Sequence, residues 1–241
     1  PEINKNVNYN KFLKELKKIR NKKRILIPKK DFEQFQSPFK KIFNRKNQKR
    51  FLEKFFKVYF LRKSFEFDEV NRYAFSHLKN LLNYFILSFF YKKNLENEKF
   101  YYFPLHVPND VALSIRAPKY LDQIKLISKI SKKINNDKIL FIKEHPAKIG
   151  ATNILKLIKI LKKKNIKILH PKVNTFDIIK RADSVITINS KTGFETILFN
   201  KPLNVFGESY YKNLNKVNYL DDKKIKLEFY KVLNNKESNN F

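Results

Sequence analysis

The chain has 241 residues, carries a formal net charge of +31 at pH 7 and contains no cysteine. Its hydrophobic content of 42% is enough to bury a core, so this length fits one large domain, or a domain with a helical appendage. The absence of cysteine excludes a disulfide framework and a thiolate metal site, and it fits a reducing compartment.

Residues 1–98 are predicted to form a mostly helical segment. Apolar residues recur there at helical spacing in three stripes, which predicts amphipathic helices with apolar faces turned inward. The stripes are Phe12, Leu16 and Ile19; Leu52, Phe55, Phe56 and Tyr59; and Val70, Ala74, Leu78, Leu81 and Phe85. Because the aromatic residues accompany leucines at this spacing, we interpret them as packing residues rather than as platforms for nucleic-acid bases.

The apolar run from Leu81 to Tyr91 is shorter than the roughly 20 residues that a bilayer span requires, and it contains Asn83 and Ser88. We therefore expect no transmembrane helix. No signal-peptide pattern is visible either. The chain begins at Pro1 and contains no methionine, which suggests that a natural N-terminus, with any targeting segment, has been trimmed away.

From Phe100 the pattern changes to apolar strands that alternate with amphipathic helices. The predicted strands cover residues 100–105, 139–142, 166–169, 185–188 and 203–206, and the predicted helices cover 118–134, 153–163, 175–181 and 194–199. Continuous apolar strands separated by helices indicate a parallel sheet covered on both faces. The predicted fold class is therefore α/β, with a Rossmann-like parallel sheet in residues 99–241 preceded by the helical segment of residues 1–98.

Polar residues stand at the carboxyl ends of the predicted strands, where open parallel sheets bind their ligands. His106 and Asp110 follow the first strand, His145 the second, His170 the third and Ser190 the fourth. His170 carries the weakest signal, and we interpret it as a residue that lines the site or the surface.

The sequence KEHPAKIG, residues 143–150, joins a predicted strand to a predicted helix. Pro146 biases His145 away from helical conformation, which would hold the imidazole at the strand end facing the crevice. A neutral histidine there can donate a hydrogen bond to a phosphate oxygen, and Lys143 adds positive charge. The alternative interpretation is a helix-entry turn with a surface histidine.

The stretch from Val185 to Glu208 predicts a strand, a polar turn and a helix. Backbone N–H groups at such a helix start have no intrahelical partner and carry the positive end of the helix dipole, so the turn can bind a phosphate or carboxylate. The candidate phosphate-binding residues are Asn189, Ser190, Lys191, Thr192 and Gly193. Glu195 would accept hydrogen bonds from sugar hydroxyls. The alternative is a capping box, in which Thr192 and Glu195 only cap the helix.

The loop of residues 104–110 places Asp110 after a strand, with Arg116 a few residues further on. A carboxylate in such a crevice could serve as nucleophile or base in transfer at a sugar carbon, although a solvated loop aspartate is commoner. The sequence contains no GxGxxG, P-loop, HExxH or Cys/His metal spacing. These absences argue against a dinucleotide oxidoreductase, a P-loop NTPase and a zinc hydrolase, and we expect no metal site.

Taken in order, four motifs resemble the capsular polysaccharide biosynthesis family, which includes the bacterial retaining β-Kdo transferases of capsule synthesis. The motifs are YYFPLHVPNDVALSI (101–115), Tyr120 with Gln123, KEHPAKIG (143–150) and ITINSKTGFETILFNKPLNVFGESYY (186–211). The resemblance implies a GT-B type glycosyltransferase of capsule synthesis and export, with two Rossmann-like domains. Because residues 1–98 cannot hold a full acceptor domain, we expect the C-terminal, donor-binding half with connecting helices, inactive in transfer on its own.

The resemblance also implies a substrate and residue roles. The donor would be a nucleotide sugar, CMP-Kdo in the best-known members, and the acceptor a growing glycan or glycolipid, with no further cofactor. His145 would contact the donor phosphate and Asp110 would be the catalytic carboxylate. Lys143, Glu195 and the turn of residues 189–193 would bind the donor. The residues expected to contact the acceptor or line the cleft are His106, Arg116, His170 and Tyr210.

The sequence departs from the family pattern at two of these places. Asn109 and Asp110 stand where some relatives have paired acids, which argues against a mechanism that needs two carboxylates in this loop. Lys191 lies between Ser190 and Thr192, where many relatives have only small or hydroxyl residues before the glycine.

The positive charge is spread over both halves of the chain and has three explanations. They are drift of solvated surfaces toward lysine, attraction to anionic lipid, and binding of nucleic acid. We expect a cytoplasmic protein, peripheral on the inner membrane near a lipid-linked acceptor. The alternatives are a basic nucleic-acid-binding protein, which only the charge supports, and a non-catalytic family member that binds a glycan or partner protein.

Overall fold

The computed structural model describes residues 36–61, 70–95, 99–134, 138–211 and 217–220, and of Val70 and Tyr73 only the backbone. The predicted stripe of Phe12, Leu16 and Ile19 lies outside the described residues. Within the described ranges, no helix is both long and apolar enough to cross a membrane.

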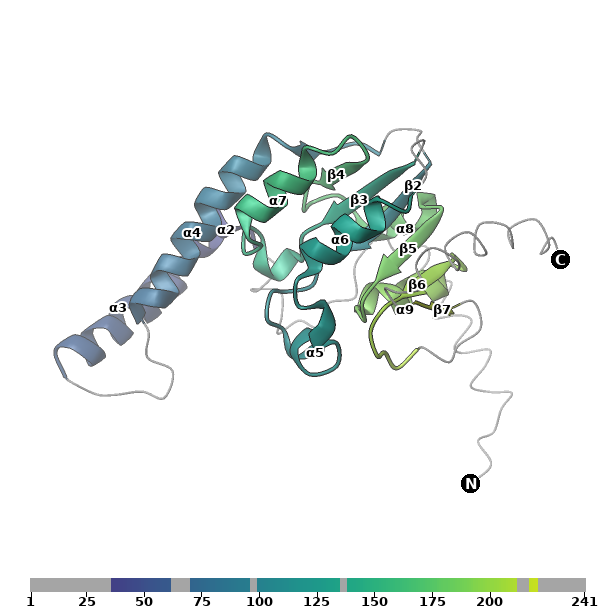
Figure 1. Cartoon of the computed structure of the whole chain (residues 1–241). Coiled ribbons are helices and arrows are strands. Elements are labelled where there is room, and N and C mark those ends of the chain that lie inside the picture. Colours follow the sequence, from purple (N-terminus) through teal and green to yellow (C-terminus); the bar gives the residue numbers. More distant parts are fainter. Residues whose placement is uncertain (1–35, 62–69, 96–98, 135–137, 212–216, 221–241) are drawn as a thin grey trace, which may run out of the picture.

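The centre of the molecule is a parallel sheet of seven strands (Figure 1). The strands are β1 (Tyr91–Lys92), β2 (Phe100–Pro104), β3 (Ile139–Lys143), β4 (Ile166–Leu169), β5 (Ser184–Thr187), β6 (Leu203–Val205) and β7 (Val217–Tyr219). They lie in the order β1-β4-β3-β2-β5-β6-β7, and all their pairings are parallel. The five predicted strands are confirmed. β1 and β7 went unpredicted because two or three residues are too few for a periodic signal.

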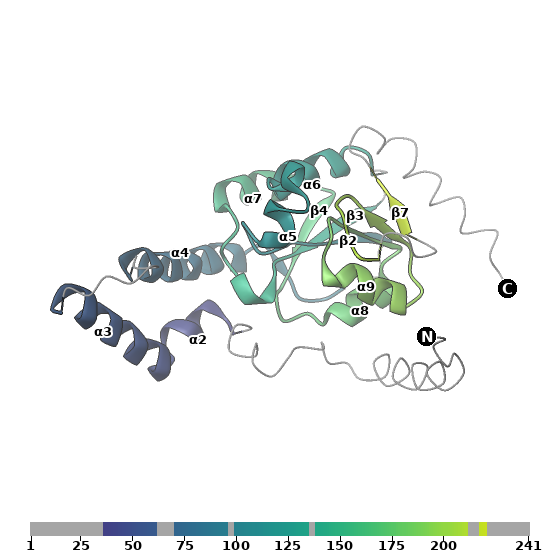
Figure 2. The same ribbon diagram turned by 90° about the horizontal axis from the view of Figure 1, so that it is seen from below.

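Helices cover both faces of this sheet. They are α5 (Val111–Ser114), η2 (Pro118–Tyr120), α6 (Gln123–Ser131), η3 (Pro146–Lys148), α7 (Ile154–Leu161), α8 (Thr175–Arg181) and α9 (Lys191–Leu198). Figure 2 shows α6 and α7 on one side of the sheet and α8 and α9 on the other. The predicted fold class, an α/β protein with a Rossmann-like parallel sheet, is confirmed.

Two predicted helix boundaries are wrong. The helix expected over residues 118–134 is divided into η2 and α6, because Asp122 caps a new helix by accepting a hydrogen bond from the Lys125 N–H at 3.1 Å. The helix expected to follow Gly193 begins at Lys191, because Ser190 takes the extended conformation of an N-cap residue.

Alternate residues of β2 divide the core into two clusters. Tyr101 and Phe103 pack on the side of α6 and α7, whereas Phe100 and Tyr102 pack on the side of α8. Both faces are buried, so apolar side chains are needed at successive positions of the strand. The strand ends are therefore the places where the sheet can carry polar groups.

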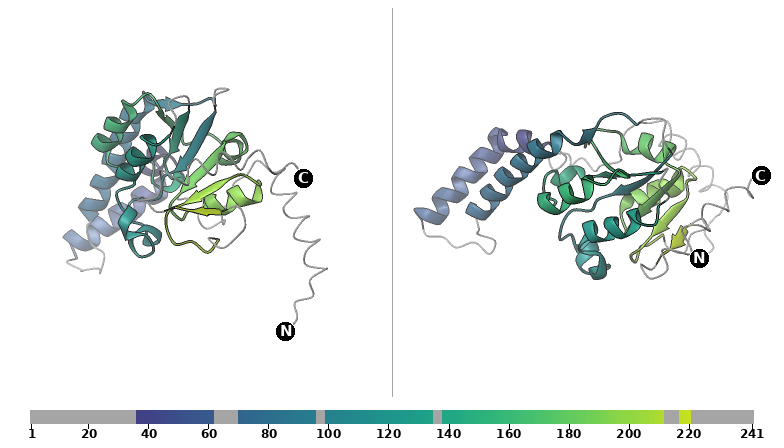
Figure 3. Two further views of the ribbon diagram at one scale, coloured as in Figure 1. Left: turned by 45° about the vertical axis from the view of Figure 1, so that its right-hand side comes forward. Right: turned by 45° about the horizontal axis from the view of Figure 1, so that its top comes forward.

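The N-terminal part of the described chain forms a helical hairpin. It consists of α2 (Pro38–Ile42), α3 (Arg45–Tyr59) and α4 (Val70–Ser88), and α3 and α4 project from the α/β part (Figures 1 and 3). α4 is anchored near its end by the fully buried Leu87 and by Asn83, whose side-chain N–H donates to the Gly150 carbonyl at 2.8 Å.

The prediction that the hairpin stripes are packed inward is wrong. Leu52, Phe55, Phe56 and Tyr59 of α3 are exposed, as are Leu78 and Phe85 of α4. Ala74 and Leu81 are half-buried, and the side chain of Val70 lies outside the description. α4 docks instead through Asn83 and Leu87, so the apolar face seen in the sequence points away from the α/β part.

Gly150 makes the docking of α4 possible. Its φ of +77° is in the left-handed region, and a Cβ atom at this position would overlap the Asn80 carbonyl oxygen. The Gly150 N–H also donates to Glu144 Oε1 at 3.1 Å. This glycine therefore allows α4 to approach closely and does not belong to a phosphate loop.

The substitution Gly150→Ala should lower the free energy of unfolding by about 2–4 kcal/mol, because it combines backbone strain with a clash against α4. Urea unfolding measures this change. Asn200→Gly is the control, since Asn200 is exposed at a φ of 56° and glycine relieves strain there. Equal midpoints for native chain and Gly150→Ala would contradict the role of Gly150.

Candidate functional site

The strand order puts three of the predicted motifs side by side. β2 is flanked by β3 and β5, and the chain runs from β2 through β3 to β4 before it returns to β5 on the other side. This reversal makes the carboxyl ends of β2 and β5 the switch point at which parallel sheets of this kind bind ligands. His106 follows β2, His145 follows β3 and Asn189 follows β5, so the three residues stand at the ends of adjacent strands.

His106 connects the ends of β2 and β5. The Gln123 side chain accepts from the His106 N–H at 2.7 Å and donates to the His106 carbonyl at 3.3 Å. The Asn189 backbone N–H donates to His106 Nε2 at 3.5 Å, so the neutral ring carries its proton on Nδ1. Burial lowers the pKa of His106 to about 4, with the Asp110 carboxylate opposing this change. His106 is thus a neutral residue that positions the β5–α9 turn.

Asp110 lies in the loop between the end of β2 and α5. It occupies the N-cap position of α5, yet its side chain makes no capping hydrogen bond. Its charge opposes the burial that lowers the pKa of His106 and His145, so the carboxylate lies within electrostatic reach of both rings. Asn109 precedes it with a φ of 60°, which turns the loop sharply before α5. The structure therefore brings Asp110 and His145 together.

His145 adopts the extended conformation that Pro146 predicts, with φ −65° and ψ 126°. Its Nδ1 accepts from the Ala147 N–H at 3.2 Å, so the neutral ring carries its proton on Nε2. Burial lowers its pKa, and Asp110 opposes this effect. Lys41 of α2 donates to the Ala147 carbonyl at 2.6 Å, so the hairpin holds this loop from outside.

Glu144, which the sequence analysis does not single out, holds the same loop from inside. Its carboxylate accepts from Tyr91 Oη at 2.8 Å and from the Gly150 N–H at 3.1 Å, and burial raises its pKa. The sequence feature that could have identified Glu144 is its position as a second charged residue, next to Lys143, at the end of an apolar strand. Such a residue, once buried, needs hydrogen-bond partners.

Lys143 and Glu195 bring opposite charges into the interior below the turn. Lys143 is 3% exposed and donates to the Val173 carbonyl at 2.6 Å and to Thr175 Oγ1 at 3.0 Å. Burial lowers its pKa to about 8. Glu195 is 7% exposed, and burial raises its pKa to about 7 against the opposing charges of Lys191 and Lys143. Each group thus moderates the cost of burying the other.

The capping-box interpretation of Thr192 and Glu195 is wrong. Ser190 is the N-cap residue, so Thr192 and Glu195 both lie inside α9, and Glu195 is on the buried side of the helix. A capping box needs its acidic residue at the third helical position, which is Gly193 here. The Glu195 carboxylate therefore lies in the interior of the site and is not a helix cap.

The β5–α9 turn is held by groups that local sequence did not reveal. Ser190 Oγ and Thr187 Oγ1 share a hydrogen bond of 2.8 Å, and the Ser190 N–H donates to Thr187 Oγ1 at 3.3 Å. Tyr211 Oη donates to the Ser190 carbonyl at 2.7 Å. The sequence feature that could have predicted the contact between Thr187 and Ser190 is the presence of a threonine inside the apolar strand of residues 185–188.

Gly193 accommodates Tyr211. A Cβ atom at position 193 would overlap the Tyr211 hydroxyl and ring, and the Gly193 N–H already donates to the Ser190 carbonyl at 3.0 Å. Gly207 similarly lies against Ile188 and Ala117. All three glycines of the chain therefore permit close packing.

The remaining predicted residues lie around this cluster. Asn189 donates to the Ala112 carbonyl at 2.7 Å, and its buried Oδ1 has no hydrogen-bond partner. His170 is directed elsewhere, with its ring edge-on to Tyr91 at 5.3 Å. Arg116 is exposed after α5. Tyr210 is exposed and its ring lies tilted against Phe194 with the centroids 5.8 Å apart, while partial burial and the Glu195 charge raise its pKa.

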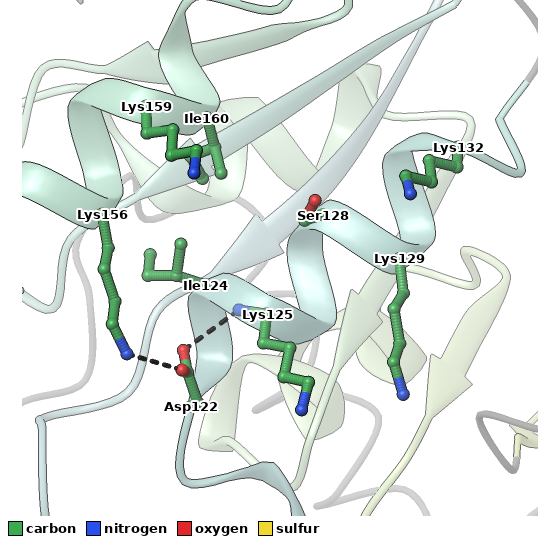
Figure 4. Close-up of a pocket in the computed structure, with 9 residues that line it drawn as sticks. All are labelled: Asp122, Ile124, Lys125, Ser128, Lys129, Lys132, Lys156, Lys159 and Ile160. Atoms are coloured by element: carbon green, nitrogen blue, oxygen red, sulfur yellow. Dashed lines mark hydrogen bonds and ion pairs between the residues drawn. The ribbon is translucent and has the colours of Figure 1, made fainter.

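A separate basic hollow lies between α6 and α7 (Figure 4). Its volume is about 350 Å³, and an ion pair between Lys156 and Asp122, at 2.7 Å, spans the two helices beside it. Lys125, Lys129, Lys132 and Lys159 complete its charged lining. It shares no residue with the cluster at the strand ends.

The sequence model of the family described as capsule polysaccharide biosynthesis protein matches residues 8–215, which is most of the chain. The chain belongs to this family. No curated protein matches this capsule polysaccharide biosynthesis protein.

Solved structures also resemble this family member. The β-Kdo 2,7 transferase of Thermosulfurimonas dismutans KpsC is 17% identical, with a TM-score of 0.43, over 74% of this chain and 55% of that chain. The β-Kdo 2,4 transferase of the same KpsC is 13% identical, with a TM-score of 0.41, over 61% and 52%. UDP-GlcNAc 2-epimerase of Methanocaldococcus jannaschii is 18% identical, with a TM-score of 0.44, over 64% and 45%. The chain thus spans about half the length of these proteins.

Glu195 should give the stability of the protein a distinctive pH dependence. The folded chain retains the Glu195 proton between pH 4.5 and about 7, where the unfolded chain releases it, so stability falls as the pH rises through this window. Relative to Glu195→Gln, the free energy of unfolding should fall by up to about 3 kcal/mol across the window.

Urea unfolding at a series of pH values measures this slope. Glu53→Gln, on the exposed surface of α3, is the control and should leave the native pH dependence unchanged. A native chain and a Glu195→Gln variant with parallel pH profiles would rule out a proton held by Glu195.

Proposed function

We propose that this chain is the donor-binding half of a capsule polysaccharide glycosyltransferase of the GT-B type. It binds a nucleotide-activated sugar, of which CMP-Kdo is the leading candidate, and a second Rossmann-like domain supplies the acceptor side. The observation that carries this proposal is the convergence of the Asp110 loop, the His145 loop and the β5–α9 turn at the switch point of the sheet. A nucleotide in this crevice would meet all three.

The residues around the crevice suit a phosphate-linked sugar. His145, with its proton on Nε2, can donate to a phosphate oxygen while it remains neutral. Lys191, exposed at the start of α9, adds positive charge beside the helix N-terminus. These groups would orient the donor and carry the charge of the leaving nucleotide.

Asp110 is placed for the chemical step. Its carboxylate is not used as a helix cap and lies within electrostatic reach of the two histidines, so a sugar carbon bound beside His145 would lie near it. As a nucleophile it would attack the anomeric carbon and displace the nucleotide, and the acceptor hydroxyl would then displace the carboxylate. As a base it would take the proton of the acceptor hydroxyl while that oxygen displaces the nucleotide. Lys143 and Glu195 belong to the support of the site, because Lys143 directs two hydrogen bonds into the protein.

The acceptor in this proposal is a glycan or lipid-linked saccharide of capsule synthesis and export. A lipid-linked acceptor places the protein on the cytoplasmic side of the inner membrane, as a peripheral protein. A family member that binds glycan without transferring sugar would share the fold but not the affinity for nucleotide.

Calorimetric titration of the 241-residue chain with CMP and with UDP tests donor binding. We expect one nucleotide to bind, and His145→Ala to weaken it about tenfold, because a hydrogen bond to a charged phosphate is lost. His170→Ala is the matched control, since His170 packs on Tyr91, and it should change the affinity less than about twofold. A folded chain that binds neither nucleotide, or binds equally after His145→Ala, would refute the proposal.

Asp110→Asn separates chemistry from binding. The substitution preserves shape but removes the charge, so sugar transfer in the complete enzyme should fall at least about a hundredfold. Nucleotide affinity should stay within about threefold, because Asp110 is assigned to the sugar carbon. Transfer rates and titrations on the same preparation provide both values, and unchanged transfer would remove Asp110 from the mechanism.

A further inference from the structure

An exposed apolar face runs along α4. Phe75, Leu78, Leu82 and Phe85 are spaced three or four residues apart, which places them on one side of α4, with Ile86 beside them and Phe89 directly after the last helical residue. Phe75 is 68% exposed, Leu82 56% and Phe89 88%. At 1.5 Å per residue this outer face is roughly 15 Å long from Phe75 to Phe85. Exposed apolar surface of this extent is typical of an interaction site.

The position of this outer face is determined by how α4 docks. Asn83 and Leu87 attach the opposite side of the helix to the α/β part, through the Gly150 carbonyl and the main core cluster. The adjoining side of α4 contacts α2 and α3, where Ala74 and His77 line a pocket that Leu78, at the border of the outer face, also lines. At the N-terminal end of the outer face, Asn71 donates to Tyr59 Oη of α3 at 2.5 Å. Among the described residues Phe75, Leu82 and Phe89 remain more than half exposed, and the hairpin that carries the outer face projects from the α/β part (Figure 3).

The charges beside the outer face are positive. Glu53 is the only acidic residue of α3 and α4, whereas lysine and arginine recur along both helices. Arg72 and Lys79 flank the outer face on α4, and Lys54 and Lys57 lie on α3 among exposed Phe55 and Phe56. Apolar side chains bordered by basic ones are the pattern of helices that lie in the interface of an anionic membrane.

We propose that the outer face of α4 binds the surface of an anionic phospholipid bilayer, with its phenylalanine and leucine side chains inserted among the lipids. This inference deepens the proposed function and rests on it in one respect, because a lipid-linked acceptor requires a membrane nearby.

Two other occupants fit the same face less well. A second copy would bring the basic residues of two hairpins together, and a protein of net charge +31 repels itself. Nucleic acid would suit the lysines and the aromatic rings of α3, but Leu78, Leu82 and Ile86 cannot stack on bases as aromatic side chains do. A bilayer accommodates both the aliphatic side chains and the charge.

The contacts of the hairpin link this surface to the candidate site. Lys41 of α2 binds the Ala147 carbonyl and Asn83 of α4 binds the Gly150 carbonyl, and both carbonyls belong to the loop that carries His145. A bilayer held by α4 would therefore lie at a fixed distance and orientation from the crevice, so a lipid-linked acceptor would approach from a defined side.

Tryptophan fluorescence can test the proposal directly, because the chain contains no tryptophan. Phe89→Trp places a probe on the outer face of α4, and Leu155→Trp places one on α7, where Leu155 is 78% exposed beside Lys156. Addition of mixed phosphatidylglycerol and phosphatidylcholine vesicles should shift the emission of the Phe89→Trp variant to the blue and expose its indole to brominated lipid quenchers. The Leu155→Trp variant should not respond, although the surroundings of its probe are equally basic.

Vesicle flotation of charge-reversing variants provides the matched affinity measurement. Leu82→Glu should weaken binding to the mixed vesicles at least about tenfold, because the variant loses a leucine that would insert into the bilayer and gains a negative charge. Leu155→Glu adds the same charge next to Lys156, which lines the α6–α7 hollow, and should change binding less than about threefold. Pure phosphatidylcholine should bind the native chain weakly.

The proposal is overturned if the two probes respond alike, if the two glutamate variants bind vesicles equally, or if the Phe89→Trp variant self-associates and is already blue-shifted without lipid. Preferential binding of single-stranded DNA that Leu82→Glu abolishes would assign the face to nucleic acid instead. Titration of Leu82→Glu with CMP separates this inference from the proposed function. Native nucleotide affinity with lost vesicle binding supports the membrane surface, whereas vesicle binding without nucleotide binding refutes only the proposed donor site.

Discussion

The hydrogen bonds of His106 are the constraint on which the rest of the site depends. Gln123 fixes the His106 backbone from α6, and the His106 ring accepts from the Asn189 N–H at the end of β5. These contacts join the strands at the point where the chain reverses its direction across the sheet. Since burial keeps the ring neutral, the joint is maintained over the physiological pH range. This joint positions the β5–α9 turn, and Asn189 in the turn also donates to the Ala112 carbonyl of α5, the helix that follows the Asp110 loop.

Buried charge is tolerated next to this joint because it is paired and hydrogen-bonded. Lys143 donates hydrogen bonds to the Val173 carbonyl and to Thr175 Oγ1. The Glu144 carboxylate accepts hydrogen bonds from Tyr91 Oη and the Gly150 N–H. An unpaired ion at these depths would cost several kcal/mol. These buried hydrogen bonds thus stabilise the polar strand ends from inside the protein. They also stabilise the loops that carry the proposed donor-binding groups. Stiff support of this kind is what a site for a charged substrate requires.

Much of this arrangement was predictable from sequence, because it follows from periodicity. Apolar strands alternating with amphipathic helices specify a parallel sheet, and the strand-end rule brings His106, His145 and Ser190 to one edge. The partners of these residues were not predictable. Tyr211 and Thr187 reach Ser190 through the fold, and Gln123 reaches His106 from a helix seventeen residues further along the chain.

The failed predictions have a common physical cause. A helical stripe of apolar residues shows that one face avoids water, but it does not say what covers that face. For α6 the cover is the sheet, whereas for α4 the chain covers the opposite side of the helix, through Asn83 and Leu87. The start of α9 was misplaced for a related reason, since Gly193 resembles a helix breaker and is instead required by the ring of Tyr211.

The contact between Gly193 and Tyr211 has a consequence for the evolution of the site. The tyrosine occupies the volume of the missing side chain and also donates to the Ser190 carbonyl, so its removal leaves both a void and an unpaired carbonyl. A relative with a side chain at the position of Gly193 must carry something smaller than tyrosine at the position of Tyr211. The two positions are therefore bound to change as a pair, although seventeen other residues separate them in the sequence.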